Sequence, residues 1–224
     1  MTQTKQHEQD VDVWVGKRFP LTIRRLGVNG HGIGYYKHKV CFVPGALPNE
    51  VVVAEVTRVL PRYLEAKIHR IRKKSRDRVT PRDEYADIAG GFELENLAYQ
   101  QQLKFKRQVI IDSLEKFQPY GYRNYDVRPT IAAPEEYGYR NKAQFQIRMV
   151  NGKVAAGLYQ PNSHTLVDME TCAVQMPRTM ETVRAVTKMI EDLQIPVYDE
   201  KHNSGIIKTL AVRESWSTGE VQLT

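Results

Sequence analysis

The side chains best suited to chemistry in this sequence are cations, aromatic rings and amides that together could hold a polyanion. The densest group lies between residues 62 and 78, where eight Lys and Arg residues stand against two acids, Glu65 and Asp77. Because neutralising phosphates is the usual role of such a positive field, this stretch predicts polyanion binding. A solvated, charged linker is the alternative interpretation of the same run.

The second group is the string at residues 137–148, YGYRNKAQFQIR. Its rings can stack on bases, its cations can bind phosphate, and its amides can read base edges. It is also the pattern of an amphipathic strand with Ala143, Phe145 and Ile147 inward, and the two interpretations are compatible. The residues from which we predict RNA contact here are Tyr139, Arg140, Asn141, Lys142, Gln144 and Arg148.

The excess of positive over negative charge lies entirely in the first third of the chain. Residues 1–81 hold 16 Lys and Arg against 7 Asp and Glu, whereas residues 82–224 hold 17 against 19. We therefore predict a basic RNA-binding module beside a nearly neutral domain. Its predicted contact residues are His31, Lys37, Lys39, Arg62, Arg70, Arg72, Lys73 and Lys74. For His31, a plain surface position in a turn is the alternative.

Neither cysteine has the surroundings of a nucleophile. Cys41 lies between Val40 and Phe42 and is expected to be a small buried hydrophobe. Cys172 follows acidic residues, which tend to raise the pKa of a thiol. The glycines at residues 27–34 lie between two expected strands and not before a helix, which argues against dinucleotide binding. We predict no catalytic residue and no metal site in this chain.

The elements that must position these groups change character along the sequence. Short β runs at residues 19–23, 35–43, 51–59 and 64–71 predict a five-stranded, OB-like β-barrel. Helical spacing follows at 94–116, then a hairpin around Asn151-Gly152, a strand at 166–169, and a helix from Pro177 to before Pro196. Strands at 206–215 and 220–223 end the chain. This second part is expected to be an α+β domain.

These patterns divide the chain of 224 residues into four expected parts. They are a disordered tail at 1–12, an OB-fold RNA-binding domain at 13–75, a linker at 76–92 and the α+β domain at 93–224. No apolar run approaches the roughly 20 residues of a membrane span, and the polar N-terminus is unlike a secretory signal. We expect a cytoplasmic monomer that binds RNA and neither DNA nor membranes.

Several ordered motifs together resemble one family, the S-adenosylmethionine-dependent RNA uracil-5-methyltransferases, which form 5-methyluridine in ribosomal or transfer RNA. Residues 27–71 are similar to the family's N-terminal TRAM domain, an OB-type RNA-binding barrel, and residues 90–106 to the start of its central domain. The resemblance continues at Tyr139 to Lys142, Gly157 to Tyr159, Val167-Asp168 and Cys172, and so spans nearly the whole chain.

One departure from the family concerns an iron–sulfur cluster. Many members hold a [4Fe–4S] cluster through three cysteines around the Gly-Gly pair and a fourth further on. The matching positions here are Asp83, Ala89 and Phe92, and only Cys172 is a cysteine. One thiolate cannot hold such a cluster, so we predict none.

A second departure concerns length. Family members continue into a Rossmann-like methyltransferase domain with the cofactor site, a cysteine nucleophile and a general base. The resemblance therefore implies S-adenosylmethionine as the cofactor of the parent enzyme, at a site outside this chain, and a Rossmann-like domain absent from it. Because the sequence stops within a β run at Thr224, we expect a truncated chain that binds RNA without methylating it.

The expected function is thus the RNA-recognition part of an RNA uracil-5-methyltransferase, with 23S ribosomal RNA favoured over transfer RNA. The alternative is a free-standing OB-fold RNA-binding or adaptor protein without enzymatic activity. A third interpretation is a translation-associated OB protein that binds RNA without sequence preference.

Overall fold

The computed structural model describes residues 12–224, so the tail expected at residues 1–12 lies outside the described residues apart from Asp12. The chain divides into two compact units. Unit 1 comprises the residues up to Val79 together with Asn96–Pro129, and unit 2 comprises Thr80–Glu95 together with Thr130–Thr224. The expected parts were 13–75, 76–92 and 93–224. The limits of the two units differ from these because each unit is made of two separate segments of the chain.

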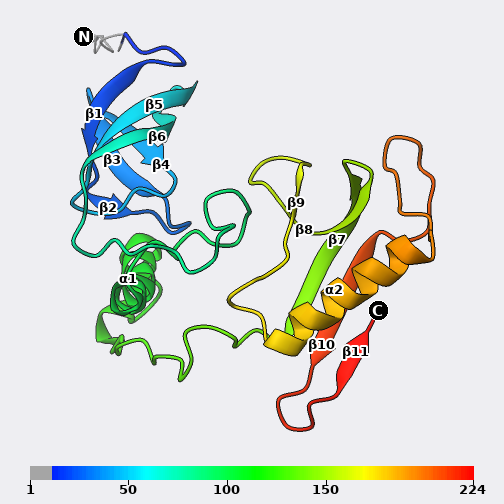
Figure 1. Ribbon diagram of the computed structural model, residues 1–224. Coiled ribbons are helices and arrows are strands. Elements are labelled where there is room, and N and C mark those ends of the chain that lie inside the picture. Colours follow the sequence, from blue (N-terminus) through cyan, green and yellow to red (C-terminus); the bar gives the residue numbers. More distant parts are fainter. Residues whose placement is uncertain (1–11) are drawn as a thin grey trace, which may run out of the picture. The chain divides into compact units, whose positions relative to one another are not determined.

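Unit 1 contains a six-stranded sheet in the order β1-β5-β6-β4-β3-β2 (Figure 1). Its strands are β1 (Arg18–Thr22), β2 (Arg25–Leu26), β3 (Gly32–Tyr36), β4 (Lys39–Val43), β5 (Val51–Val59) and β6 (Tyr63–Lys73). The expected number of five strands is wrong, because the run at 35–43 is divided between β3 and β4 and because the two-residue β2 lies outside all of the expected runs. Lys37 and His38 adopt positive φ angles of 45° and 69°, which turn the chain into the β3–β4 hairpin.

The core of unit 1 follows from alternation along its strands. Phe19 and Leu21 of β1 point inward, as do Val52, Ala54 and Val56 of β5, and all five are buried. Gly34 allows β3 to approach β1, because a Cβ there would lie 2.7 Å from Thr22 O and from Leu21 Cγ. Gly34, in the glycine run at 27–34, therefore permits close backbone approach.

Helix α1 (Tyr99–Phe117) and the short 3-10 helix η1 (Tyr122–Asn124) belong to the second segment of unit 1. The helix starts five residues later than the spacing of Leu94 and Leu97 suggests, and Gln118 ends it in the left-handed conformation. None of the residues of α1 is buried. No helix among residues 12–224 has both the length and the apolar composition needed to cross a membrane.

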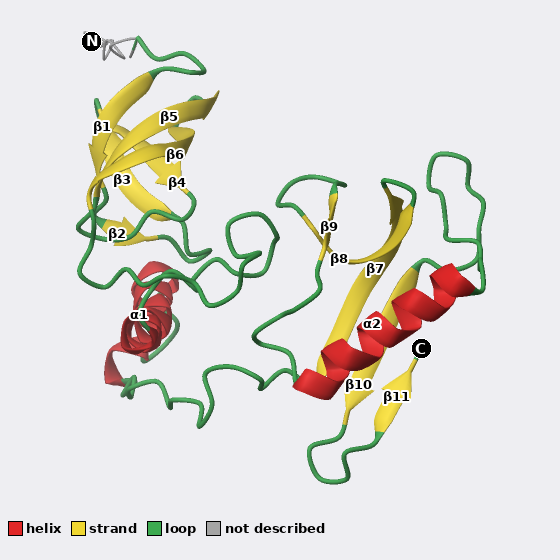
Figure 2. Cartoon of the chain, viewed as in Figure 1, coloured by secondary structure: helices red, strands yellow, loops and turns green. Residues whose placement is uncertain are grey.

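Unit 2 is an antiparallel sheet with one long helix on it (Figure 2). The strand order is β11-β10-β7-β8-β9, and every pair is antiparallel. The elements are β7 (Lys142–Val150), β8 (Lys153–Tyr159), β9 (Leu166–Asp168), α2 (Pro177–Asp192), β10 (Thr209–Glu214) and β11 (Val221–Leu223). The Asn151-Gly152 hairpin is confirmed, with both residues at the positive φ that a type I′ turn requires.

Helix α2 covers one face of this sheet. Met180 and Val183 of α2 pack in a single apolar cluster with Phe145 and Ile147 of β7. The loop at residues 80–95 adds side chains to the same cluster, including Phe92. The expected pattern of β7 is confirmed, since Ala143, Phe145 and Ile147 are buried and the residues between them are exposed or half-buried. The uncovered face of β7 therefore carries only the second half of the polar string, namely Lys142, Gln144, Gln146 and Arg148.

Candidate nucleic-acid interface

Irregularities in the pairing of β6 with β5 decide which basic side chains of β6 point to the surface. The register skips His69 between Ile68 and Arg70, and skips Arg72 between Ile71 and Lys73. A β-bulge of this kind places an extra residue on the bulged strand and bends it. Ile68 and Ile71 still pack against the core, while the other side chains from His69 to Lys73 are exposed. The bulges thus bring more cations to the surface than strict alternation would allow.

An acidic neighbour neutralises only the middle of β6. Glu55 of β5 lies 3.0 Å from Lys67 Nζ and 2.6 Å from Arg18 Nε. Hydrogen bonds from Lys67 and Arg18 hold the pKa of Glu55 below its ordinary value. Among residues 12–224, no carboxylate lies within salt-bridge distance of the four cations that follow, Arg70, Arg72, Lys73 and Lys74. We call these four residues the basic end of β6, although Lys74 directly follows the last residue of the strand.

The other predicted cations of unit 1 lie elsewhere. Lys37 is in the β3–β4 turn and Lys39 begins β4, whose partner β6 runs parallel to it from Val40 opposite Tyr63. Arg62 directly precedes Tyr63. Lys39 of β4 and Arg62 therefore lie beside the first residue of β6, at the opposite end of that strand from its basic end. His31 precedes β3, at the opposite end of that strand from Lys37, and its Nδ1 lies 3.1 Å from Asn29 Nδ2. The structure therefore separates the predicted residues into three places.

A buried ion pair fixes the chain that follows the basic end. The side chain of Glu50 is fully buried, and it accepts hydrogen bonds from Arg78 Nε at 2.6 Å and Arg78 Nη2 at 2.9 Å. The backbone N–H groups of Leu47 and Ser75 donate to the same carboxylate. Arg78 Nη2 also donates to Gly45 O at 2.6 Å. This network ties the loop before β5 to the segment after β6.

The Glu50 network makes the stability of unit 1 depend on pH. Burial raises the pKa of Glu50, but hydrogen bonds from Arg78, Leu47 and Ser75 outweigh it and hold the pKa below its ordinary 4.5. The carboxylate therefore stabilises the folded state above the unfolded-state pKa, and this contribution is lost as the pH falls below about 4.5. We expect the difference in urea midpoint between the wild type and Glu50→Gln to narrow between pH 7 and pH 3.5. A difference that is constant over this range would contradict the assignment.

In unit 2 the predicted string begins as an extended segment beside residues 173–176. Gly138 N donates to Ala173 O, Arg140 N donates to Val174 O, and Met176 N donates to Arg140 O. The side chains of Tyr139, Arg140, Asn141, Lys142 and Gln144 are exposed. These five predicted residues are close together in the sequence, and all of them are exposed in the structure.

Arg148 is less available than the sequence suggests. Its Nη1 donates to Ile147 O at 2.8 Å and to Lys208 O at 3.1 Å. Its guanidinium carbon lies 5.9 Å from the ring centre of Tyr198 and 6.0 Å from that of Tyr159. The half-buried guanidinium thus joins β7 to the segment before β10, and its role at this surface is to hold neighbouring groups in position.

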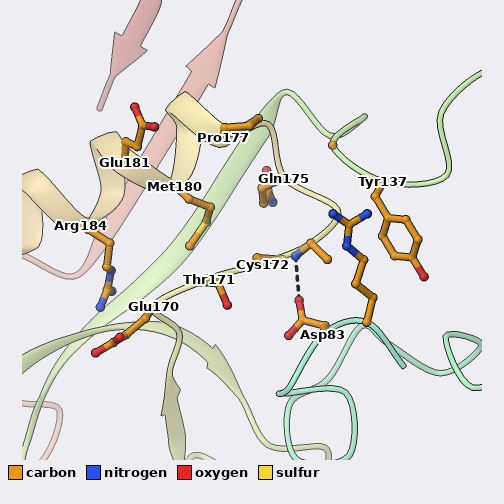
Figure 3. A pocket seen from close by; sticks show the side chains of 13 residues that line it. Asp83, Tyr137, Glu170, Thr171, Cys172, Gln175, Pro177, Met180, Glu181 and Arg184 are labelled. Atoms are coloured by element: carbon orange, nitrogen blue, oxygen red, sulfur yellow. Dashed lines mark hydrogen bonds between the residues drawn. The ribbon is translucent and has the colours of Figure 1, made fainter. Parts of the chain in front are cut away.

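A cavity of about 690 Å³ opens in unit 2 beside the N-terminus of α2 (Figure 3). The loop at residues 80–95 borders it through Asp83, whose Oδ2 accepts a hydrogen bond from Ala173 N at 2.8 Å. Tyr85 strengthens the same link, since Glu170 N donates to its hydroxyl oxygen. The residues that line this cavity are Arg82, Asp83, Tyr137, Gly138, Glu170, Thr171, Cys172, Ala173, Gln175, Pro177, Met180, Glu181 and Arg184.

Sequence patterns did not predict this cavity. Its lining comes from three segments, near residues 82, 137 and 170–184, that are far apart in sequence. Tyr137 lies in the predicted string but was not among the predicted contact residues. Gln175 sits in a short stretch between a strand and a helix, where no periodic pattern draws attention to it. A partial signal was the Tyr137-Gly138-Tyr139 sequence, which places rings beside a flexible position.

The four positions that the resemblance assigns to cluster ligands lie in the core of unit 2. Ala89, Phe92 and Cys172 pack in its apolar cluster, and Asp83 is buried beside them. Burial, and then the charge of Asp83, raise the pKa of Cys172 to about 11, so its thiol is protonated at neutral pH. Burial likewise raises the pKa of Cys41 to about 12. One protonated thiol and one carboxylate beside two apolar side chains form a donor set that does not fit a [4Fe–4S] cluster.

Comparison with known families decides what unit 1 is. Residues 12–69 match the family described as the TRAM domain. This range covers all six strands of the sheet up to His69 of β6. Unit 1 contains a TRAM domain. The basic end of β6 therefore begins where the matched range of the TRAM domain ends.

The whole chain is similar to proteins named RNA methyltransferases. An uncharacterised RNA methyltransferase of Lactiplantibacillus plantarum is 63% identical over 99% of this chain and 46% of its own length. Proteins of the same name from Enterococcus faecalis and Listeria innocua are 47% and 48% identical over 93% of this chain, and 46% of each is covered. The chain spans about half the length of these relatives. The similarity supports an RNA methyltransferase family, and it does not support the expectation that this chain is an inactive fragment.

A solved structure shows the same fold. The tRNA (uracil-54, C5)-methyltransferase of Pyrococcus abyssi, in complex with S-adenosyl-L-homocysteine, matches 91% of this chain and 44% of its own chain. The TM-score is 0.62 at 23% sequence identity. The expected fold class, which held a Rossmann-like methyltransferase domain to be absent from this chain, is contradicted by this match to a methyltransferase chain. Almost all of the fold described here recurs within a methyltransferase chain.

Proposed function

We propose that this protein is an S-adenosylmethionine-dependent RNA methyltransferase that forms 5-methyluridine, and that residues 12–224 bind its RNA. The observation that carries the proposal is the unpaired basic end of β6, which adjoins a TRAM domain in a chain similar to RNA methyltransferases along its length. Four cations with no carboxylate of the described residues within salt-bridge distance favour a polyanion over a protein surface of mixed charge.

The chain's own residues would act on the RNA by binding and orienting it. Arg70, Arg72, Lys73 and Lys74 would hold successive phosphates, which fixes the register of the strand without reading its sequence. Tyr139, Asn141 and Gln144 of unit 2 offer a ring and two amides to unstacked bases. Arg140 and Lys142 would bind nearby phosphates, with Arg148 holding the sheet surface in place. The predicted residues at His31, Lys37, Lys39 and Arg62 would contact RNA more weakly at the margins of unit 1.

S-adenosylmethionine, when bound, supplies the methyl group for transfer to a carbon of the base. The two glycine-rich stretches within residues 12–224 do not fit its nucleotide part: residues 27–34 form the turn after β2 and the start of β3, and Gly90-Gly91 lies in a turn of the loop at 80–95. Neither precedes a helix as a nucleotide-binding loop does. We therefore assign none of these residues to the cofactor.

The test of this function is a methylation assay on the protein that carries this chain. It is incubated with methyl-labelled S-adenosylmethionine and, in separate reactions, with unmodified ribosomal RNA and transfer RNA, and the RNA is digested to nucleosides. We expect label in 5-methyluridine from one of the two RNA classes, and the class that is labelled identifies the substrate. RNA binding without label in either class would contradict the proposal and favour an adaptor protein. Label in a different nucleoside would contradict the assignment to uracil C5.

A further inference from the structure

The cavity of unit 2 contains an unused hydrogen-bonding group. Gln175 is 6% exposed, and no donor among residues 12–224 lies within hydrogen-bond distance of its Oε1. Its Nε2 has one weak contact, with Lys142 O at 3.5 Å. Figure 3 shows this amide between Pro177, Cys172 and Tyr137 at the cavity. Because a buried polar atom without a partner is costly, an acceptor in this position points to a donor that is supplied from outside the chain.

The charges around the cavity exclude a phosphate as that ligand. Three carboxylates line it, those of Asp83, Glu170 and Glu181, against the guanidinium groups of Arg82 and Arg184. Two nitrogens of Arg184 are already used, since its Nη1 lies 3.0 Å from Asp168 Oδ1 and its Nη2 donates to Ala156 O, and only its Nε has no partner among residues 12–224. An anion would therefore meet more negative than positive charge. A neutral group with N–H donors is favoured instead.

One wall of the cavity is a flat platform. The guanidinium carbon of Arg82 lies 4.7 Å from the centre of the Tyr137 ring, so the two groups stack. Arg82 is exposed and Tyr137 is half-buried, which leaves the outer side of this pair open. Aromatic rings and Arg guanidinium planes are the surfaces on which unpaired RNA bases stack. Pro177 and Met180 add apolar surface nearby.

We propose that this cavity binds one unpaired nucleobase of the RNA whose edge carries an amino group beside a ring-nitrogen acceptor. This inference rests on the proposed RNA-binding function. Gln175 Oε1 would accept a hydrogen bond from the amino group, and Nε2 would donate one to the ring nitrogen, which is the pairing that Gln makes with adenine. Cytosine offers the same edge, but adenine has the larger face for stacking. Uracil lacks an amino group and is disfavoured by the carboxylates at the rim.

The cavity would thus recognise a base other than the uracil proposed for methylation. A neighbouring adenine held in this way would fix the position of the strand relative to unit 2. Sequence preference would then arise from Gln175, whereas the basic end of β6 in unit 1 would contribute affinity for any sequence.

The test compares Gln175→Met with the wild type, using fluorescein-labelled nine-nucleotide rA, rC and rU strands and fluorescence anisotropy. Met keeps the length of the side chain and removes both polar atoms, and loss of an unpaired acceptor should leave the fold stable. We expect the wild type to bind rA roughly tenfold more tightly than rU, with rC between them. In Gln175→Met the ratio of rA to rU affinity should fall towards one while rU affinity is unchanged. Gln160→Met, an exposed amide of the same unit outside the cavity, is the control and should keep the wild-type ratio.

A second measurement is independent of RNA backbone contacts. In nuclear magnetic resonance spectra of the wild type, adenosine monophosphate should shift the side-chain NH₂ signals of Gln175 and the amide of Ala173, and uridine monophosphate should not. An unchanged ratio in Gln175→Met, or shifts that are equal for the two nucleotides, would overturn the inference. If none of the three RNA strands binds, the proposed function fails. The titration with nucleotides still decides whether the cavity binds adenine.

Discussion

Replacing Arg70, Arg72, Lys73 and Lys74 together with glutamine is expected to weaken single-stranded RNA binding by about two to three orders of magnitude at 0.1 M salt. The estimate follows from a change of about 0.7 in the log-log salt slope for each phosphate contact that is lost. These side chains are exposed and have no acidic partner among the described residues, so their removal should change the free energy of unfolding little. Fluorescence anisotropy with a labelled nine-nucleotide rU strand measures the effect.

A matched variant separates the position of the charges from their number. Lys104, Lys106, Lys153 and Lys188 are exposed lysines outside the proposed RNA surface, and changing all four to glutamine removes the same net charge. We expect this variant to lose less than tenfold in affinity, through the weaker long-range field alone. Equal losses in the two variants would show that RNA responds to net charge and not to the basic end of β6.

Arg78→Met is expected to lower the free energy of unfolding of unit 1 by about 3–5 kcal/mol, because it leaves the buried carboxylate of Glu50 without its cation. The change also removes the hydrogen bond to Gly45 O. Urea denaturation at pH 7, followed by far-UV circular dichroism, measures the loss. The basic end of β6 should lose order with it, since Ser75 and Arg78 hold the chain that follows.

Two further variants give this prediction its controls. Arg76→Met removes an exposed cation two residues away and should change the stability by less than about 0.5 kcal/mol. Replacing both partners, with Glu50→Leu and Arg78→Met in one chain, should recover part of the loss because no buried charge remains. A loss below about 1 kcal/mol in Arg78→Met alone would show that the pair does not hold unit 1 together.

Local patterns predicted most of the elements correctly. Asn151-Gly152 predicted its hairpin and Pro177 predicted the start of α2, because in both cases the information lies in a few adjacent residues. The split of residues 35–43 into two strands escaped prediction, since Lys37 and His38 are not the residues usually found at positive φ. The bulges of β6 could not be predicted from the sequence either, because they depend on the pairing of β6 with β5.

In the candidate site, too, local sequence predicted some features, whereas others depend on tertiary packing. The basic run and the polar string were recognisable from composition alone, and β7 alternates as its sequence predicts. The cavity was not recognisable, because the contact between Asp83 and Ala173 joins residues 90 positions apart. That contact, and the burial of Gln175, are products of tertiary packing that no periodic pattern records.

The central claim, that this chain binds RNA through phosphate contacts of the basic end of β6, is tested most directly by the salt dependence of its affinity. The dissociation constant for the labelled rU strand is measured from 50 to 400 mM salt for the wild type and for the four-residue β6 variant. The wild type should give a linear log-log plot, and the variant should have a slope smaller by about 3, which is four contacts at about 0.7 each. A flat plot for the wild type, or equal slopes for the two proteins, would contradict the claim.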